Sequence, residues 1–346
     1  MKDTLRKPLG VNAWLAQLGN FILRFQSYFG LIVIIALSAL FSPTRDGGTN
    51  IFLMPPNLLN IVRFASENGI IAIGMTLVIL IGGIDLSVGA VMALAAVGCA
   101  AAMMRMGWGT APTILLALSI GGLAGLTNGL VTTRLSLQPF ITTLAMLSVA
   151  RGLASLWSGG YAIPVAFGYK PGDAPPSFKA IFAGQIVVGQ IEIPTQMLWF
   201  IGVGIIIILI LNNTGFGRHI YAIGGNETAA RLSGVSVNRV KVIVFGLCGL
   251  LCGLAAMLHV GLVNQGSHID GAGYELNAIA AVVIGGTLLS GGAGTIIGSM
   301  IGALILSILD NILGLRNISS EYQLILKGII IVLAVVIQRQ EGRSLP

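Results

Sequence analysis

Ten long apolar runs decide what this chain can fold into. Most approach the roughly 20 residues that an α-helix needs to cross the hydrocarbon of a bilayer. Only 9% of the 346 residues are charged, too few to cover a water-facing domain. We therefore predict an all-α, polytopic membrane protein. Its predicted transmembrane helices lie at residues 25–41, 58–81, 86–104, 112–133, 139–157, 195–211, 242–263, 276–290, 295–315 and 322–337.

Lysine and arginine set the orientation, because cytoplasmic loops of membrane proteins are enriched in them. With the N-terminus inside, eleven fall in cytoplasmic segments and five in external ones, so the net charge of +7 indicates topology and not nucleic-acid binding. Both termini are predicted to be cytoplasmic. The expected organisation is an amphipathic N-terminus at 1–24, one transmembrane domain at 25–338 and a tail at 339–346. Within that domain, 158–194 form an external loop and 212–241 a cytoplasmic one.

A glycine-rich motif occurs twice. Residues 81–90 read IGGIDLSVGA and residues 284–293 read IGGTLLSGGA, with seven of ten positions identical. A weaker echo links 126–134 to 309–316, and duplicated halves of this kind are typical of transporters. The helix count places both copies on the cytoplasmic side, which makes them parallel. The run 276–290 could instead be a re-entrant hairpin, so the symmetry stays open.

Both copies are predicted to form junctions where a helix ends and another begins. Adjacent glycines permit unusual dihedral angles and close backbone approach. Asp85 is expected to be the N-cap of the third span, its carboxylate meeting free amide hydrogens; a place in the substrate path is the alternative. Ser87 and Ser290 are further candidate caps. The predicted junction residues are Gly82, Gly83, Asp85, Ser87, Gly89, Gly285, Gly286 and Ser290.

Polar residues inside the spans are candidates for a substrate path, because ionisable groups are costly in lipid. Arg63 and Glu67 are four residues apart and are expected to neutralise each other on one helix face. A cavity lined by amides, hydroxyls and a few charges suits a neutral, polyhydroxylated solute. Hydrogen bonding between helices is the competing explanation for each residue taken singly. The path candidates are Arg63, Glu67, Asn68, Asn128, Thr143 and Asn311.

The loop 212–241 contains a predicted two-turn helix. Asn226 is a good N-cap, Glu227 suits the positive helix start, Glu227 and Arg231 form an i,i+4 pair, and Gly234 ends the helix. A helix this short is unstable alone, so we expect it to dock on a cytoplasmic partner. Lying on the lipid surface is less favoured, because the segment has few large apolar residues. The predicted docking residues are Asn226, Glu227, Ala229, Ala230, Arg231 and Gly234.

Motifs for catalysis are missing from the sequence. It has no G-x-x-x-x-G-K-[ST], so ATP would have to be bound by another subunit, and no H-E-x-x-H or G-x-S-x-G. The three cysteines lie in apolar runs and the three histidines form no ligand pattern, so we expect no metal site. An enzyme is disfavoured.

Several stretches resemble the permease subunits of sugar-import ABC transporters: GMTLVILIGGIDLSVGAVMAL, QPFITTLAM, FGRHIYAIGGNETAARLSGVSV and GYELNAIAAVVIGGTLLSGG. The resemblance covers about residues 57–337 and is nearest to the branch that carries ribose. It implies a bacterial inner-membrane protein with three partners: a second permease copy, a cytoplasmic ATPase that binds ATP and Mg, and a periplasmic or lipid-tethered sugar-binding protein. Residues 226–234 match the family's coupling helix, and Asn68 matches a family position.

The chain departs from the family pattern at Asn277, where relatives commonly carry Asp, and at Ala293. Its loops 42–56 and 158–194 are longer than usual. The alternatives are a permease for xylose, galactose, inositol or an autoinducer sugar, and, from another class, an ATP-independent ion-coupled carrier or channel.

Overall fold

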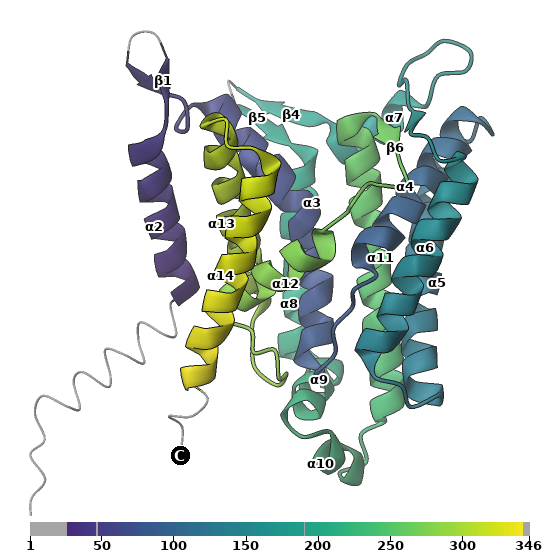
Figure 1. Cartoon of the computed structure of the whole chain (residues 1–346). Helices are drawn as coiled ribbons and strands as arrows, with labels where there is room; N and C mark the ends of the chain where they lie inside the picture. Colours follow the sequence, from purple (N-terminus) through teal and green to yellow (C-terminus); the bar gives the residue numbers. More distant parts are fainter. Residues whose placement is uncertain (1–25, 46–47, 190, 342–346) are drawn as a thin grey trace, which may run out of the picture.

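The computed structural model describes residues 26–45, 48–189 and 191–341 and is almost entirely helical (Figure 1). The predicted N-terminus at 1–24 lies outside these residues. The helices are α2 (Gln26–Phe41), α3 (Pro55–Leu80), α4 (Val88–Met104), α5 (Thr110–Arg134), α6 (Pro139–Ser158), α7 (Pro176–Ala183), α8 (Thr195–Asn213), α9 (Gly215–Gly225), α10 (Glu227–Leu232), α11 (Val237–Val263), α12 (Tyr274–Ile284), α13 (Ile296–Leu315) and α14 (Ser320–Glu341).

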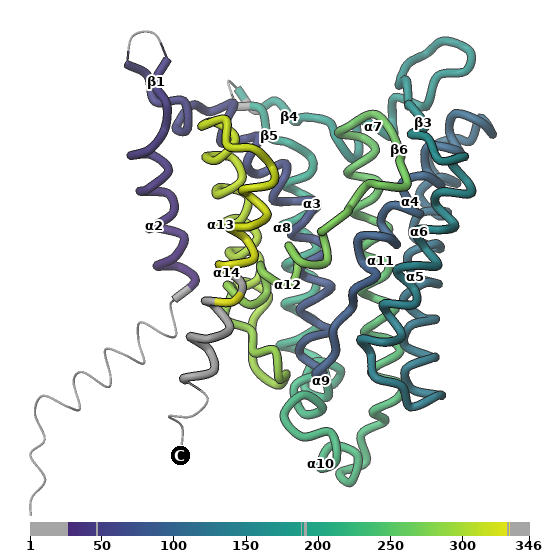
Figure 2. The backbone as a smooth tube through the Cα atoms, in the orientation of Figure 1, coloured from purple at the N-terminus to yellow at the C-terminus, as the bar shows by residue number. Residues whose placement is uncertain are grey.

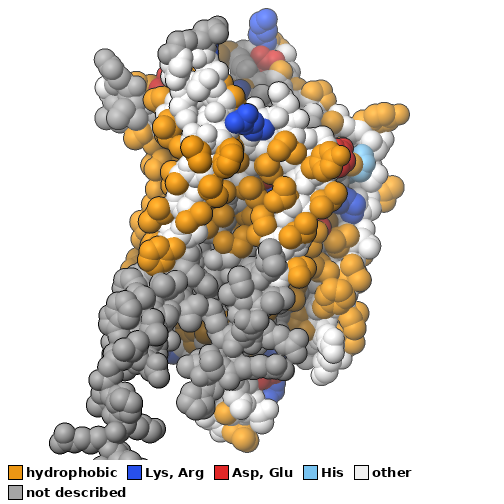
Figure 3. Space-filling model, turned by 60° about the vertical axis from the view of Figure 1, so that its left-hand side comes forward, with side chains coloured by type: hydrophobic (Ala, Val, Ile, Leu, Met, Phe, Trp, Pro, Cys, Tyr) orange, Lys and Arg blue, Asp and Glu red, His pale blue; other side chains and the backbone are white. Residues whose placement is uncertain are grey.

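Six of the described helices are long and apolar enough to cross a membrane: α3, α5, α6, α8, α11 and α13. Three shorter apolar helices, α2, α4 and α12, accompany them. A helix occupies each of the ten predicted positions, but only these six meet the length and composition expected of a full span. Hydrophobic side chains cover most of the described surface on the face shown in Figure 3, and charged ones are sparse there. The chain is a multi-pass membrane protein.

The two ends of the molecule differ. One end, here called the hairpin end, carries α7 and the antiparallel pairs β1 (Thr44–Arg45) with β2 (Thr49–Asn50), β3 (Ile163–Pro164) with β6 (Gln265–Gly266), and β4 (Gln185–Val188) with β5 (Ile191–Pro194). The opposite end, here called the α10 end, carries α9 and α10. Helix α2 begins and α14 ends towards the α10 end (Figure 1). The predicted loop 158–194 contains β3, α7, β4 and β5; the sequence analysis did not predict this secondary structure.

Helix α3 is central, because every residue from Gly69 to Leu80 is buried against α11, α13, α8 and α12. The most extensive contact among the described helices joins α5 to α11. It depends on close backbone approach: a side chain on Gly125 would overlap the carbonyl oxygen of Phe245, and one on Gly249 would overlap that of Gly121. Small residues at such crossings are how helices associate in lipid, where burial of apolar surface gives little driving force.

Two chain breaks interrupt the bundle (Figure 2). After α3 the chain turns at the α10 end and rises through 81–87 before α4 begins. After β6 it descends from the hairpin end through 267–273 before α12 begins. The eleven residues of α12 rise only about 16 Å, half of a hydrocarbon core of roughly 30 Å. The stretch 264–295 runs from the hairpin end to the α10 end, and α12 occupies only part of that course (Figure 2).

Candidate functional site

The first break, residues 81–87, is held in place by hydrogen bonds from α5 and α6. Thr143 on α6 accepts from the amide of Leu86 at 3.1 Å and donates to the carbonyl of Ile84 at 3.2 Å. Asn128 on α5 donates to the hydroxyl of Ser87 at 2.9 Å. Asn128 and Thr143, two of the predicted path residues, are therefore brought together with the glycine-rich junction, where they fix the backbone between α3 and α4.

Asp85 is not the N-cap of α4, contrary to prediction. The cap position belongs to Ser87, whose side chain makes no capping bond to the helix. Ser87 instead donates both its amide, at 2.8 Å, and its hydroxyl, at 2.6 Å, to the Asp85 carboxylate. The carboxylate is 2% exposed and stabilises the turn before the helix, which is the local use that Asp side chains have in Asx turns.

The second glycine-rich segment lies beside the first at the α10 end. The amide of Gly292 donates to the carbonyl of Leu80 at 3.0 Å, so the end of α3 is bonded directly to it. Gly82 in the first segment and Gly286 in the second have φ of +75° and +86°, a conformation that favours glycine. Gly83 bonds back to Val78 and ends α3. Both copies thus occupy the same end of the molecule.

Ser290 caps no helix, although it was a candidate. Helix α13 begins six residues later with Thr295 as its N-cap, and the Thr295 hydroxyl accepts from the amide of Gly298 at 3.0 Å. Gly285 instead allows α12 to touch α13, because a side chain there would overlap the backbone of Gly298. The second segment is therefore a turn between α12 and α13, and the N-cap of α13 lies after it, at Thr295.

The two breaks meet inside the bundle. A side chain on Gly89, in the first turn of α4, would overlap the carbonyl oxygen of Gly271, just before α12, and would crowd the Glu275 carboxylate. The starts of α4 and α12 are therefore neighbours, although one is reached from the α10 end and the other from the hairpin end (Figure 2). Interrupted helices whose starts converge within the membrane are where transporters place their binding sites.

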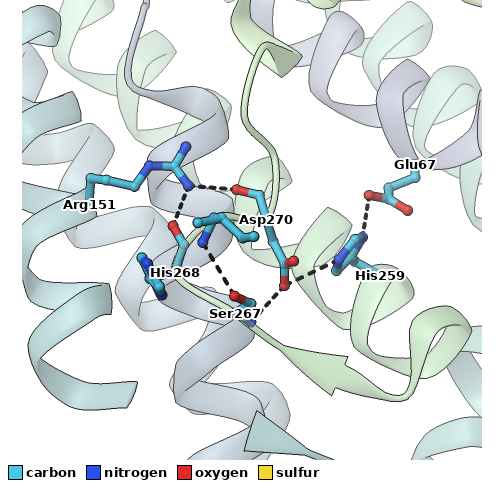
Figure 4. Close-up of polar contacts among 7 residues, drawn as sticks. Glu67, Arg151, His259, Ser267, His268 and Asp270 are labelled. Atoms are coloured by element: carbon cyan, nitrogen blue, oxygen red, sulfur yellow. Dashed lines mark hydrogen bonds and ion pairs between the residues drawn. The ribbon is translucent and has the colours of Figure 1, made fainter. Parts of the chain in front are cut away.

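A buried charged cluster lies between this meeting point and the hairpin end (Figure 4). Nδ1 of His259, on α11, is 2.7 Å from Oε1 of Glu67, on α3, and its Nε2 is 3.3 Å from Oδ2 of Asp270. All three side chains are at most 11% exposed. The guanidinium of Arg151, on α6, donates to the carbonyl oxygens of His268 and Asp270 at 2.5 and 2.7 Å. The cluster ties the descending segment 267–273 to three helices.

The predicted pairing of Arg63 with Glu67 is wrong, because Glu67 turns towards His259. Arg63 lies nearer the hairpin end, where it donates to Asn60 at 3.1 Å and contacts Gln185 of β4. It lines a cavity of about 790 Å³ between α3 and the β4–β5 hairpin.

The remaining two path candidates lie apart from the breaks. Asn311, on α13, exchanges two hydrogen bonds with Asn57, at 3.0 and 2.8 Å, and so joins two helices. Asn68 is half-buried next to Glu67, and its side-chain oxygen has no hydrogen-bond partner in the described part of the chain. An amide oxygen left in this state is available to a ligand hydroxyl.

Sequence reasoning missed His259 and Asp270. The sequence analysis considered the three histidines only as possible metal ligands. The overlooked signal was a histidine inside the apolar run 242–263, where an ionisable residue requires a partner. That partner lies 192 positions away in the sequence, so spacing could not reveal it.

Helix α10 has the predicted form. The Asn226 side chain accepts from the amide of Ala229 at 2.9 Å. At the other end the amide of Gly234 (φ +86°) bonds to the carbonyl of Arg231 and that of Val235 to the carbonyl of Ala230, which is a Schellman motif. Capping hydrogen bonds at both ends explain how a segment of six residues remains helical.

Glu227 anchors α10 to α11. Its carboxylate is 2.7 Å from Nζ of Lys241 and 3.1 Å from the Arg231 guanidinium. Partial burial raises the pKa of Glu227, but these two cations outweigh burial and bring the pKa below its usual value. Ala230 is buried, whereas Leu232 is 85% exposed at the tip of the molecule. One face of α10 is thus fixed and the other is free.

A cavity of about 330 Å³ lies between α10 and both glycine-rich segments, lined among others by Gly82, Ser290, Gly225 and Glu227. Helix α9 closes one side: the Tyr221 hydroxyl donates to the carbonyl of Gly294 at 3.0 Å, and Gly224 lies against Leu80 and Gly292. Helix α9, which leads directly into the helix predicted to dock on a partner, therefore touches the turns that follow α3 and α12.

A bundle of apolar helices with two interrupted segments, closed at one end by a short capped helix, defines a membrane transport protein. The chain belongs to the family described as the permease component of the branched-chain amino acid transport system, whose pattern matches residues 57–335.

Alignments with named relatives cover most of this chain. It is 40% identical to the ribose import permease protein of Bacillus subtilis (strain 168) over 340 residues, 98% of each chain. It is 39% identical to the ribose import permease protein of Escherichia coli (strain K12) over 318 residues, which cover 91% of this chain and 94% of the relative. Identity to the xylose transport system permease protein of the same E. coli strain is 33% over 362 aligned positions, covering 90% and 91%. No solved structure matches this chain.

Proposed function

We propose that this protein is the membrane-spanning permease subunit of an ATP-driven bacterial sugar importer, with ribose as its cargo. The observation that carries the proposal is 39–40% identity to ribose import permeases over almost the whole chain. Xylose is the second candidate, because xylose permeases match nearly as much of the chain at 33–34% identity. The chain itself forms the path, and ATP with Mg binds to a separate ATPase.

The α10 end is assigned to the cytoplasm of the bacterial inner membrane. Arg134, Arg218, Arg231, Arg239 and Lys241 gather there, as expected for a cytoplasmic side. Fixed on one face and exposed on the other, α10 is suited to receive an ATPase. At the hairpin end, α7 and the β4–β5 hairpin offer an external surface on which a sugar-binding protein docks.

A second copy of the chain is part of the proposal, because the segment 267–273 needs a cover. Irregular backbone does not face lipid at membrane depth; it is covered by protein or lines a water-filled cavity. Yet Ile269 is 65% exposed and Leu276, in the first turn of α12, is 53% exposed. These residues lie where α12 begins, about half the thickness of a hydrocarbon core away from the turn at the α10 end. Two copies facing each other across α6, 267–273 and α12 would bury this segment and enclose the sugar path between them.

The sugar path then runs past the point where α4 and α12 begin. Two buried polar atoms without a partner among the described residues belong to the segment before α12 and to its first turn, Nδ1 of His268 and Oε2 of Glu275; a third, Oδ1 of Asn68, lies beside Glu67 on α3. A sugar hydroxyl can donate hydrogen bonds to the two oxygens, and it can donate to or accept from the ring nitrogen, depending on the tautomer of His268. Few such contacts give weak binding, which lets the sugar leave again.

Reconstitution tests the proposal. The chain is placed in liposomes with its ATPase and with binding protein outside, and entry of labelled ribose, xylose and galactose is measured. Uptake of ribose that requires both ATP and binding protein is expected. Uptake by the purified chain alone, driven by an ion gradient, would instead identify a carrier. Preferential uptake of xylose would change the proposed sugar and leave the proposed class of importer unchanged.

Docking of α10 is tested with Glu227→Lys and Arg231→Glu in the same chain. The doubly reversed chain keeps the i,i+4 attraction but sets the former Glu227 position against Lys241, which turns α10 out of place. We expect ATPase association to be lost. Normal association and uptake would refute the docking role.

A further inference from the structure

A groove runs along the lipid-facing side of the α5–α11 contact. Its walls are Leu115, Leu118, Ser119, Gly122, Leu123 and Leu126 of α5 with Ile243, Gly246, Leu247 and Leu250 of α11. It encloses about 460 Å³ and is almost wholly apolar. Gly122 and Gly246 form the floor of the groove where the two helices cross, and Leu250 and Leu126 from the facing helices pack over them.

A basic pocket lies next to the groove, towards the α10 end. This second cavity, of about 310 Å³, is lined by Leu130, Thr133 and Arg134 of α5 with Asn238, Arg239, Val242 and Ile243 of α11. Ile243 lines both cavities, so they are neighbours along one seam between α5 and α11. Arg134 and Arg239 are both exposed, and neither has a hydrogen-bond or ion-pair partner among the described residues.

We propose that this seam binds an anionic phospholipid, with an acyl chain in the apolar groove and the phosphate between Arg134 and Arg239. Basic pockets between transmembrane helices on the cytoplasmic side are where anionic head groups bind. The guanidinium groups supply fork-shaped donors that match phosphate oxygens. Asn238 and Thr133 add neutral polar groups at the same depth.

A single leaflet spans the seam from Arg134 as far as Ser119, and Leu115, at the far end of the groove, lies about one helical turn beyond it. From Arg134 to Ser119 the helix rises about 22 Å, at 1.5 Å per residue. Half of a bilayer including its head groups is about 20–22 Å thick. A lipid whose phosphate is held at Arg134 therefore extends its tail to about Ser119 without leaving its own leaflet. A second copy of the chain fits this seam less well, because two unpaired arginines would face the same two arginines across a symmetric contact.

Lipid retention by the purified full-length chain tests the proposal. The chain is equilibrated in mixed micelles with equal phosphatidylglycerol and phosphatidylcholine, and bound lipid is counted by native mass spectrometry. We expect selective retention of phosphatidylglycerol. Arg134→Gln and Arg239→Gln should each weaken it roughly fivefold, and the double variant about 25-fold, because one cation near a membrane surface contributes about a fivefold factor.

Two further variants separate the parts of the site. Arg218→Gln removes another exposed arginine at the α10 end, outside the seam, and should leave retention unchanged. Ser119→Phe places a ring in the groove and should weaken retention of both lipids while the preference for phosphatidylglycerol persists. Equal retention of the two lipids by the unaltered chain would overturn the proposal, as would undiminished phosphatidylglycerol on the double arginine variant. Dissociation of a dimer by Ser119→Phe with lipid retention unaffected would show that a second copy fills the groove instead.

Discussion

The ion pair between Glu67 and His259 should be one of the strongest single interactions between helices in this protein. Its atoms are 2.7 Å apart, and the two side chains are 4% and 11% exposed. Hydrogen bonds between helices in membranes contribute on average about 0.6 kcal/mol and at most about 1.7, because the unfolded state in lipid also finds partners. Hydrogen bonds to charged groups reach about 1.5–3 kcal/mol. We therefore expect a coupling energy of about 2 kcal/mol for this pair.

A double-mutant cycle measures that coupling. Glu67→Gln, His259→Gln and the double variant are compared with the unaltered chain by unfolding in mixed micelles of increasing dodecyl sulfate content. The matched control is Arg231 with Glu227, at 3.1 Å, where the two side chains are 55% and 42% exposed. Exposed pairs give less than about 1 kcal/mol. A coupling of 0.6 kcal/mol or less for the buried pair, or one no larger than that of the control, would refute the reasoning.

Three further predictions concern other parts of the chain. Asn226→Ala should weaken the N-cap of α10 by about 1 kcal/mol, seen as weaker ATPase binding with unchanged folding of the bundle. Gly125→Leu should prevent α5 from reaching α11 and abolish the monodisperse protein, whereas Gly152→Leu, whose added side chain meets open space, should be tolerated. Because the pKa of Glu227 is lowered, its stabilisation is complete above the ordinary value of 4.5 and is lost as the pH falls through the lowered pKa. A spin label at Ala229 should therefore keep its mobility from pH 7 to 5 and loosen only below; loosening above pH 5 would contradict this.

The sequence predicted correctly those features that depend only on residues close together in the chain. The N-cap at Asn226, the stop at Gly234 and the pair of Glu227 with Arg231 all form within one short helix, and all are confirmed. The positions of the apolar helices followed equally well, since length and hydropathy are local properties.

Errors arose where a distant element competed for the same group. Arg63 and Glu67 have the right spacing to pair, yet the pair does not form because His259 meets Glu67 from another helix. The prediction that Asp85 is the N-cap is wrong for a related reason. Ser87 occupies the cap position and donates its amide and hydroxyl to the Asp85 carboxylate. Intrinsic preference sets the candidates, and tertiary contacts select among them.

The positions of the two copies of the glycine-rich motif suggest what the repeat does. Gly224 of α9 lies against Leu80, immediately before the first copy, and against Gly292 in the second, while Tyr221 bonds to Gly294, immediately after the second. Asn226 alone separates α9 from α10. The first copy contains the break between α3 and α4; the second follows α12, whose own break lies at its start. A displacement of α10 by a partner would therefore reach both interrupted segments together. If the proposed ATPase docks on α10, coupling needs no relay across the membrane, because both turns contact α9, the helix next to α10.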